Sequence, residues 1–177
     1  MQLLIISMIL LWLVVLVNLF LTLALIRRVN KSRSLGEPIE TLPVGELAPD
    51  FFAETMGNER VTLGDYAGRT LAMVFISPTC GHCRPIIPQV EALGPKAKRS
   101  GVELTFVCDA EIDQTQAYIQ ELNITLPVLS APRQSNHFLE YYKVNGVPAY
   151  VLINTQGKVE AFGHPEDLEW KRVSDKW

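Results

Sequence analysis

The sequence predicts an α/β fold, with a mixed sheet covered by helices on both faces, preceded by one N-terminal transmembrane helix. Apolar runs of strand length alternate with segments of helical spacing from residue 46 onward, which is typical of α/β folds. Residues 3–26 contain no charged side chain, and this predicts the membrane helix. At 177 residues the chain is long enough for one domain besides that helix.

The uncharged segment is long enough to cross a bilayer, which takes roughly 20 apolar residues of helix. A cleaved signal peptide fits less well, because no basic residue precedes the segment and residues 23–27, Leu-Ala-Leu-Ile-Arg, offer no Ala-x-Ala cleavage site. We therefore expect residues 1–28 to form an uncleaved anchor that contacts membrane lipid through residues 3–26. The alternatives are a cleaved leader and a buried core helix.

The basic residues that follow this segment bear on its orientation; they are Arg27, Arg28, Lys31 and Arg33. The positive-inside tendency would leave this side of the membrane in the cytoplasm. The thiol chemistry described below instead favours a soluble domain outside the cytoplasmic membrane of a bacterium. Both orientations stay open, and the extracytoplasmic one is our expectation, against which these basic residues argue.

A linker separates the anchor from the rest of the chain. Residues 29–44 are polar at their start and are then interrupted by Gly36, Pro38 and Pro43, which favours an irregular segment. Residues 45–177 are expected to form the α/β domain.

The strands of this domain are predicted from short apolar or β-branched runs. Residues 70–77 are apolar at nearly every position, as central strands are. Residues 149–154 and 158–162 flank the turn Thr155-Gln-Gly157 and predict a terminal hairpin. The other predicted strands are residues 61–63, 104–108 and 127–129.

Helices are predicted between and after these strands, over residues 81–99, 114–122 and 136–144 and from residue 165 onward. The first is expected to kink at Pro88 and to break at Gly94-Pro95. The last is expected to begin at Pro165, because proline is favoured at the first helical position and two acidic residues follow it. This alternation predicts a largely parallel sheet, to which the terminal hairpin adds an antiparallel edge.

Cys80-Gly81-His82-Cys83 is the only Cys-x-x-Cys of the sequence and lies between the central predicted strand and the helix that follows it. Thiols at such a junction are placed for reversible disulfide exchange. A helix N-terminus favours an anion, so Cys80 is expected to attack as a thiolate from the first turn, and Cys83 to resolve the mixed disulfide. His82 can stabilise that thiolate, which makes the pair more oxidising.

Composition excludes several other classes of function. The net charge is −3, with 16 basic and 19 acidic residues, so nucleic acid is not an expected partner. Three cysteines are too few for a disulfide scaffold. Structural zinc takes four ligands and the sequence has no second cysteine pair, so neither a metal nor another cofactor is expected.

The remaining chemistry-bearing residues have plain structural interpretations. Cys108 is interpreted as a small buried residue that ends a strand, with a third redox thiol as the alternative. Phe51 and Phe52 are interpreted as core residues. An acidic cluster after the strand is interpreted as solvated charge; its members are Asp109, Glu111 and Asp113.

Three placements in the sequence resemble the thioredoxin fold. The cysteine motif follows a central strand, Pro88 lies five residues past the second cysteine, and Val147-Pro148 immediately precedes the strand–turn–strand ending. The resemblance implies a cis peptide bond before Pro148. It also implies that the backbone of Val147 faces the thiols and offers hydrogen bonds to a bound substrate peptide.

Residues 43–51 and 61–68 resemble membrane-anchored relatives of the TlpA and redoxin type. Methylamine-utilisation accessory proteins of the MauD type are the most similar, since Ser77-Pro-Thr-Cys80 and Leu126-Pro-Val-Leu-Ser130 match segments of that family. The resemblance implies an enzyme, a thiol–disulfide oxidoreductase that acts on cysteine-containing exported proteins and exchanges electrons with a membrane or soluble redox partner. The most specific role that the resemblance implies is maturation of a periplasmic enzyme such as methylamine dehydrogenase.

The sequence also departs from these families. Val74 stands where thioredoxin has a buried Asp, and Ile86 where reductases of cytochrome maturation often carry Glu, so two usual proton acceptors for Cys83 are absent. Gly81-His82 matches protein disulfide isomerases, and Pro78-Thr-Cys80 is shorter than a peroxidase loop. An oxidant or isomerase is therefore favoured. The alternatives are a dedicated reductase for apocytochrome c maturation and a non-catalytic membrane assembly factor.

Overall fold

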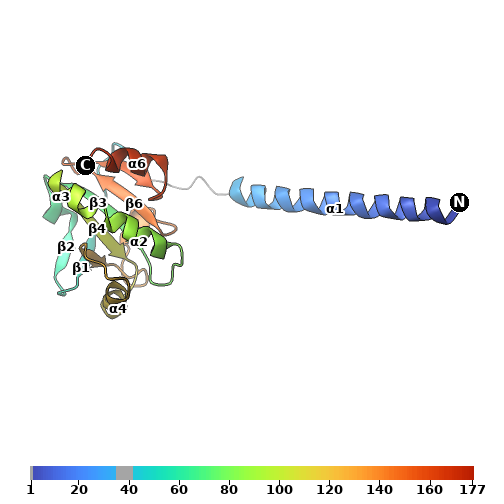
Figure 1. Ribbon diagram of the computed structural model, residues 1–177. Coiled ribbons are helices and arrows are strands. Elements are labelled where there is room, and N and C mark those ends of the chain that lie inside the picture. The colour runs from blue at the N-terminus through green and yellow to red at the C-terminus, as the bar shows by residue number, and fades with distance from the viewer. Residues whose placement is uncertain (1, 35–41) are drawn as a thin grey trace. The chain divides into compact units, whose positions relative to one another are not determined.

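The computed structural model describes residues 2–34 and 42–177, and the chain divides into two compact units, Met1–Glu40 and Thr41–Trp177 (Figure 1). The described part of the first unit is one helix, α1 (Gln2–Ser34), in which Ile5–Thr22 is long and apolar enough to cross a membrane, with a mean hydropathy of 2.6. Its described large apolar side chains are exposed, and the Thr22 hydroxyl donates to the Asn18 carbonyl at 2.8 Å. The helix thus satisfies this polar group internally, as a helix in lipid must.

The elements at the junction of anchor and domain are as follows. Helix α1 continues through Ser34 and so includes the start of the expected linker, which was predicted to begin at residue 29. The middle of that linker, residues 35–41, lies outside the described residues. Leu42 is buried in the same apolar cluster as Phe51, so the packed domain includes residues before the predicted start at residue 45.

The described part of the second unit forms one seven-stranded mixed sheet in the order β2-β1-β5-β4-β3-β6-β7. The strands are β1 (Phe52–Thr55), β2 (Arg60–Thr62), β3 (Thr70–Ile76), β4 (Val102–Cys108), β5 (Val128–Ser130), β6 (Ala149–Ile153) and β7 (Val159–Gly163). Only the pairs β3–β4 and β4–β5 are parallel, and the four others are antiparallel. The prediction of a largely parallel sheet is therefore wrong, because the hairpins β1–β2 and β6–β7 flank the parallel centre on both sides. The predicted terminal hairpin is confirmed.

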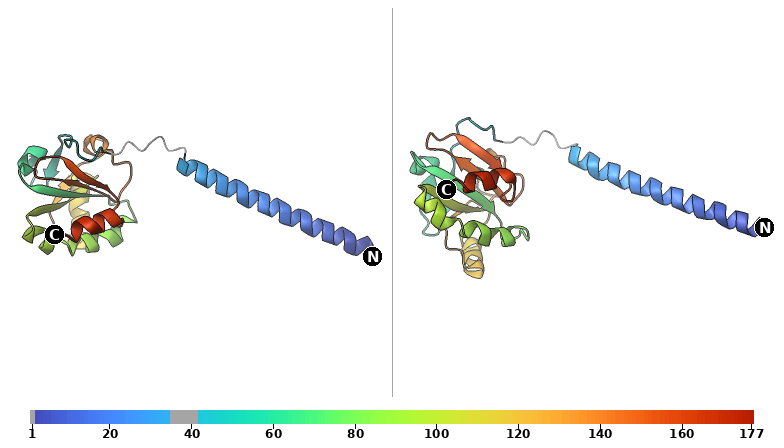
Figure 2. Two further views of the ribbon diagram at one scale, coloured as in Figure 1. Left: turned by 90° about the horizontal axis from the view of Figure 1, so that it is seen from above. Right: turned by 45° about the horizontal axis from the view of Figure 1, so that its top comes forward.

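Helices cover both faces of this sheet, as predicted. They are η1 (Leu63–Tyr66), α2 (Cys83–Glu91), α3 (Gly94–Arg99), α4 (Ile112–Leu122), α5 (Phe138–Tyr141) and α6 (Leu168–Ser174). In the left view of Figure 2, α2, α3 and α6 lie on one side of the sheet, and η1 and α5 lie on the other. Strand β3 contributes side chains to the apolar core on both faces of the sheet: Val74 packs toward α2 and Phe75 toward α5. This follows because successive side chains of a strand point to opposite faces.

Two helices begin elsewhere than the sequence indicated. Helix α6 starts at Leu168 instead of Pro165, because the Asp167 carboxylate accepts the Trp170 N–H at 2.8 Å and caps the helix. Helix α5 is only one turn, Phe138–Tyr141, within the predicted range 136–144. The predicted break after α2 is confirmed, since α3 begins at Gly94.

Strand β1 was not predicted, and it explains an error about Phe52. Phe51 is buried as expected, but Phe52 begins β1 on its solvent side and is 37% exposed. The guanidinium of Arg60 on the neighbouring strand lies 4.3 Å from the centre of the Phe52 ring and covers it in part. Phe52 is therefore a surface residue stabilised by a cation–π contact.

Candidate active site

The cysteine motif lies at the end of β3, in a tight turn before α2. The Cys80 N–H donates to the Ser77 carbonyl at 3.1 Å, and the Cys83 N–H donates to the Cys80 carbonyl at 3.2 Å. Helix α2 begins at Cys83, with His82 as its N-cap residue. Cys80 therefore precedes the helix, whereas the sequence placed it in the first helical turn.

The two thiols of the motif differ sharply in accessibility. Cys80 is half-buried, whereas Cys83 is 0% exposed. An incoming disulfide can reach the sulfur of Cys80, and the sulfur of Cys83 only through it. This asymmetry is what an attacking thiol and a resolving thiol require.

The Val147 backbone faces the accessible thiol. The Cys80 Sγ donates to the Val147 carbonyl at 3.4 Å, across 67 positions of sequence. The peptide bond between Val147 and Pro148 is cis, as the resemblance implied. Four residues singled out from the sequence thus lie at one end of the sheet, where β3 ends and β6 begins: Cys80, Cys83, Val147 and Pro148.

The Cys83 thiol is held in its protonated form. Burial first, and then a hydrogen bond with Cys80, raise the pKa of Cys83 to about 12. The backbone N–H of Ser77 opposes this by stabilising the charged sulfur, while the nearby Asp109 carboxylate adds to the rise in pKa. Cys83 is therefore a thiol at neutral pH and must lose its proton when it attacks.

The two residues between the cysteines are exposed and have few contacts. Neither Gly81 nor His82 makes a side-chain hydrogen bond or ion pair within residues 2–34 and 42–177. A Cβ added to Gly81 would meet nothing within 4 Å, so space does not require glycine there. His82 is the exposed N-cap residue of α2, two positions after Cys80.

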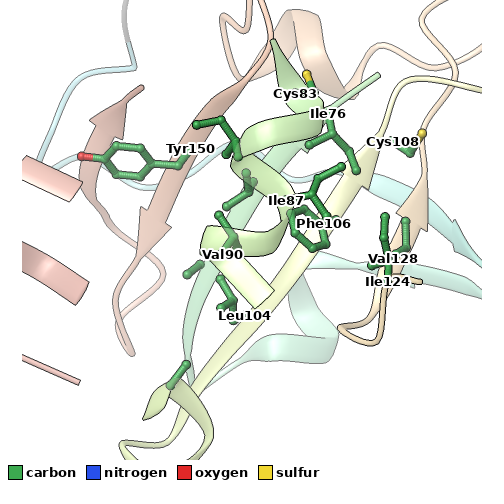
Figure 3. Packing of buried hydrophobic residues seen from close by; sticks show 14 of the residues in the cluster. Ile76, Cys83, Ile87, Val90, Leu104, Phe106, Cys108, Ile124, Val128 and Tyr150 are labelled. Atoms are coloured by element: carbon green, nitrogen blue, oxygen red, sulfur yellow. The ribbon is translucent and has the colours of Figure 1, made fainter. Parts of the chain in front are cut away.

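Apolar residues fill the positions where relatives carry acids. Val74 is fully buried and pairs in register with Phe106 of β4, and Ile86 is 2% exposed on the inner face of α2. Figure 3 shows this apolar packing beneath the motif, with Cys83 and Cys108 at the same end of the cluster. Neither position offers a carboxylate to take the proton of Cys83.

Asp109 is a site residue that the sequence interpretation missed. Its side chain is only 11% exposed, and its carboxylate accepts a hydrogen bond from Arg133 Nε at 3.0 Å. Its N–H donates to the carbonyl of Ile76, the last residue of β3. The interpretation of Asp109 as solvated charge is therefore wrong. Its place after a strand parallel to β3 was the available signal, because parallel strands end at the same edge of a sheet.

Cys108 and Tyr118 complete the surroundings of Cys83. Cys108 is fully buried at the end of β4, as interpreted from the sequence, and burial raises its pKa to about 11. Tyr118 of α4 is 3% exposed and belongs to the same apolar cluster. The apolar spacing of residues 114–122 predicted its helix, but not its proximity to the cysteines.

Comparison with known proteins gives a consistent picture. The model of the AhpC/TSA family matches residues 44–162. The thiol-disulfide oxidoreductase ResA of Bacillus thuringiensis subsp. konkukian is 26% identical over 121 residues, which cover 68% of this chain and 69% of that protein. ResA of Geobacillus kaustophilus is 29% identical over 118 residues, which cover 66% and 67%.

Solved structures share the fold. A Chlorobium tepidum protein described as a thiol:disulfide interchange protein DsbE superposes with a TM-score of 0.66 at 25% identity, covering 77% of this chain and 95% of its own. A Bacteroides thetaiotaomicron protein described as a protein disulfide isomerase superposes with a TM-score of 0.67 at 23% identity, covering 76% and 87%. The second unit therefore has a thioredoxin-like fold.

Proposed function

This chain belongs to the AhpC/TSA family, and we propose that it is a membrane-tethered thiol–disulfide oxidoreductase whose redox pair is Cys80 and Cys83. The observation that carries the proposal is the asymmetry of the pair: a half-buried Cys80 stands against the Val147 carbonyl, in front of a fully buried Cys83. Similarity to proteins named thiol-disulfide oxidoreductase supports the same reaction.

The exchange runs in two steps. The Cys80 thiolate attacks one sulfur of a client disulfide, the client bond breaks, and the other client sulfur leaves with the electron pair. Cys83 then loses its proton to solvent and attacks the Cys80 sulfur, which releases the second client sulfur as a thiolate. The client gains two electrons and the protein pair is oxidised to a disulfide. The reverse sequence forms a client disulfide, and a separate redox partner resets the pair.

The contact between Cys80 and Val147 supports a role of this backbone in holding clients. The Val147 carbonyl lies 3.4 Å from the attacking sulfur, in a segment that precedes β6 and leaves its polar groups near the thiol. An extended client segment that paired with this backbone would present its own sulfur to Cys80. Val147 and Pro148 are thus the proposed client-binding residues.

The direction of electron flow that the site favours is client oxidation or isomerisation. Val74 and Ile86 are buried and apolar, so the site holds no acid at these two positions to deprotonate Cys83. His82 is the N-cap residue of α2, two positions after Cys80, which supports a role of its imidazole in stabilising a Cys80 thiolate, and stabilising the reduced form makes the pair a stronger oxidant. The second candidate is a dedicated reductase for apocytochrome c maturation, which the resemblance to TlpA-type proteins supports. Similarity to proteins named ResA and DsbE supports thiol–disulfide exchange in either direction.

The proposed location is the bacterial cytoplasmic membrane, with α1 as a single span and the thiol domain outside. The apolar stretch Ile5–Thr22 supports the span, although the basic residues after it favour the opposite orientation. Protease added to intact spheroplasts would degrade an extracytoplasmic domain. Protection of the domain would overturn this orientation and favour a reducing role in the cytosol.

A disulfide exchange assay tests the proposed reaction. Full-length protein in detergent micelles is expected to exchange with a disulfide-bonded peptide, and Cys80→Ser or Cys83→Ser to abolish turnover. Cys108→Ser is the matched control, because Cys108 is buried and outside the motif, and it is expected to retain turnover. Full activity of Cys80→Ser would overturn the proposal and favour a non-catalytic assembly factor.

The identity of the client protein is the most specific part of the proposal. Resemblance to MauD-type proteins at residues 77–80 and 126–130 supports an exported, disulfide-rich enzyme such as methylamine dehydrogenase. A Cys83→Ser variant cannot resolve the mixed disulfide and is expected to accumulate client linked to Cys80. Mass spectrometry of that adduct separates the candidates, since a cytochrome in the adduct would favour the reductase instead.

A further inference from the structure

Tyr118 is a buried tyrosine of α4 that the exchange steps above do not use. It is 3% exposed, and its hydroxyl has no hydrogen-bond partner within the part of the chain that the structure describes. Nearly all buried polar groups in proteins are paired, so an unpaired donor beside a reactive site calls for a physical reason.

The Tyr118 ring lies near Arg84 of α2, and its own helix, α4, is hydrogen-bonded to the residue that follows β4 by two positions. On the α2 side, the Cζ of Arg84, which directly follows Cys83, lies 5.7 Å from the ring centre. One turn earlier on α4, the Thr115 hydroxyl donates to the Ala110 carbonyl at 3.1 Å, just beyond β4. Tyr118 and Cys83 belong to one apolar cluster. The unpaired hydroxyl therefore belongs to the same apolar cluster as the resolving cysteine, and the Tyr118 ring lies near Arg84, the residue after it.

Negative charge on the cysteines affects the pKa of the Tyr118 hydroxyl. Burial first, and then negative charge on the Cys83 sulfur, raise the pKa of Tyr118 to about 12. Arg84 opposes the rise, but its guanidinium is paired with Glu121 at 2.6 Å. Tyr118 therefore keeps its proton at neutral pH and stays a hydrogen-bond donor.

We propose that the Tyr118 hydroxyl donates a hydrogen bond to the Cys83 sulfur when that sulfur becomes a thiolate, an inference that rests on the proposed redox pair. In the resolving step Cys83 loses its proton to solvent water and attacks the Cys80 sulfur, and the client sulfur leaves with the electron pair. In the reverse step Cys83 leaves with the electron pair. Tyr118 keeps its own proton in both directions.

This hydrogen bond acts on rate and leaves the equilibrium alone. The hydroxyl is unpaired while Cys83 is neutral and gains its partner only when charge develops on the sulfur, which lowers the barrier selectively. Both end states hold Cys83 without charge, as a thiol or in a disulfide, because its pKa is about 12. The redox potential is therefore expected to be the same with and without the Tyr118 hydroxyl.

The two exchange steps separate in a stopped-flow experiment on full-length, reduced protein in detergent micelles. An aromatic disulfide, dithiobis-nitrobenzoate, releases one thionitrobenzoate when Cys80 attacks and a second when Cys83 resolves the adduct. Cys83→Ser identifies the first phase. Tyr118→Phe is expected to leave the first phase and the redox potential unchanged and to slow the second phase about tenfold or more, as loss of a hydrogen bond to a charged group does.

Tyr150→Phe is the matched control. The Tyr150 hydroxyl is also buried and unpaired among the described residues, in the same cluster. Its ring packs on Trp170 at 4.7 Å, and Figure 3 shows it pointing away from Cys83 and Cys108. Both phases are expected to stay unchanged in Tyr150→Phe. Equal slowing in the two variants, or a second phase of wild-type rate in Tyr118→Phe, would overturn the inference.

The same traces distinguish failure of this inference from failure of the proposed function. A wild-type protein that released only one equivalent would contradict the redox pair itself. If Tyr118→Phe does not fold, the wild-type chain labelled with fluorotyrosine replaces it, since fluorination makes the phenol a stronger donor. The second phase is then expected to accelerate, and an unchanged second phase would overturn the role of Tyr118.

Discussion

Cys80 and Val147 meet through a thiol and a carbonyl 3.4 Å apart, which places the accessible sulfur of this protein against the backbone that leads into β6. Cys83 stands behind Cys80, with no exposed surface of its own. On the proposed function, a client would therefore meet Cys80 first, on the side of Val147, and Cys83 would exchange only through Cys80.

This arrangement predicts selective alkylation. At pH 7, far below its raised pKa of about 12, Cys83 stays a thiol and is also inaccessible. Limiting iodoacetamide is therefore expected to label Cys80 of the folded, reduced protein, and to label Cys83 and Cys108 only after unfolding. Peptide mass spectrometry measures the three sites. Labelling of Cys83 as fast as Cys80 would contradict the buried resolving thiol.

Cys108 predicts a loss of stability at high pH. Its pKa is about 11 in the folded protein because it is buried, against 9.0 for an ordinary thiol. Between pH 9 and 11 the unfolded chain releases this proton while the folded chain keeps it, so the stability present below pH 9 is lost as pH rises. The two units correspond to a fall on the order of 2 kcal/mol in the free energy of unfolding.

Urea unfolding of the reduced full-length protein at several pH values measures this fall. Cys108→Ala serves as the comparison, because it removes the titrating group and keeps Cys83. The variant is expected to be less stable at every pH, through lost packing, but to show a shallower decline above pH 9. Parallel curves for the two proteins would contradict the raised pKa of Cys108.

The elements that the sequence predicted best are those in which local pattern and burial agree. Residues 71–76 are apolar throughout, and all six are buried in β3. Strand β1 lacked such a pattern, since Ala53 is its only buried residue and Phe52 faces solvent. The prediction of where α6 begins was wrong for a different reason. Proline at residue 165 fits the first turn of a helix, but the Asp167 side chain caps the helix, which begins after it.

The site shows the same division. Cys80, Cys83 and Pro148 carry sequence motifs, and their meeting was expected. Asp109 and Tyr118 carry none, because they approach Cys83 through the order of the strands and the packing of α4, which a linear pattern does not contain. Only the rule that parallel strands end at one edge could have indicated Asp109.

His82 is predicted to set the redox potential of the pair. Proline at this position suits the backbone, because the φ of His82 is −75°, close to that fixed by the proline ring. His82→Pro removes the imidazole beside Cys80 and is expected to make the pair more reducing by tens of millivolts, where about 30 mV is a tenfold change in equilibrium. Equilibration with glutathione measures the potential.

Gly81→Ala is the control for His82→Pro, since it alters the same turn without touching charge. The added Cβ meets nothing within 4 Å, so the variant is expected to fold normally and to keep the wild-type potential. A shift of equal size in Gly81→Ala would assign the effect to the turn backbone. An unchanged potential in His82→Pro would contradict the role of the imidazole in the proposal that the pair is an oxidant.

Glu91 fastens the end of α2 to the loop before β5. Its carboxylate accepts the Thr125 N–H at 3.0 Å, the Leu126 N–H at 2.9 Å and the Thr125 hydroxyl. Glu91→Ala leaves these donors without a protein partner and is expected to lower the free energy of unfolding by about 1–2 kcal/mol. Glu91→Gln keeps one acceptor oxygen and is expected to lose less. Glu160→Ala is the control, because it removes an exposed carboxylate of β7 and should change stability little.

Chemical unfolding of the full-length variants measures the effect of Glu91. Equal stability of Glu91→Ala and Glu160→Ala would show that the hydrogen bonds of Glu91 do not hold α2 in place.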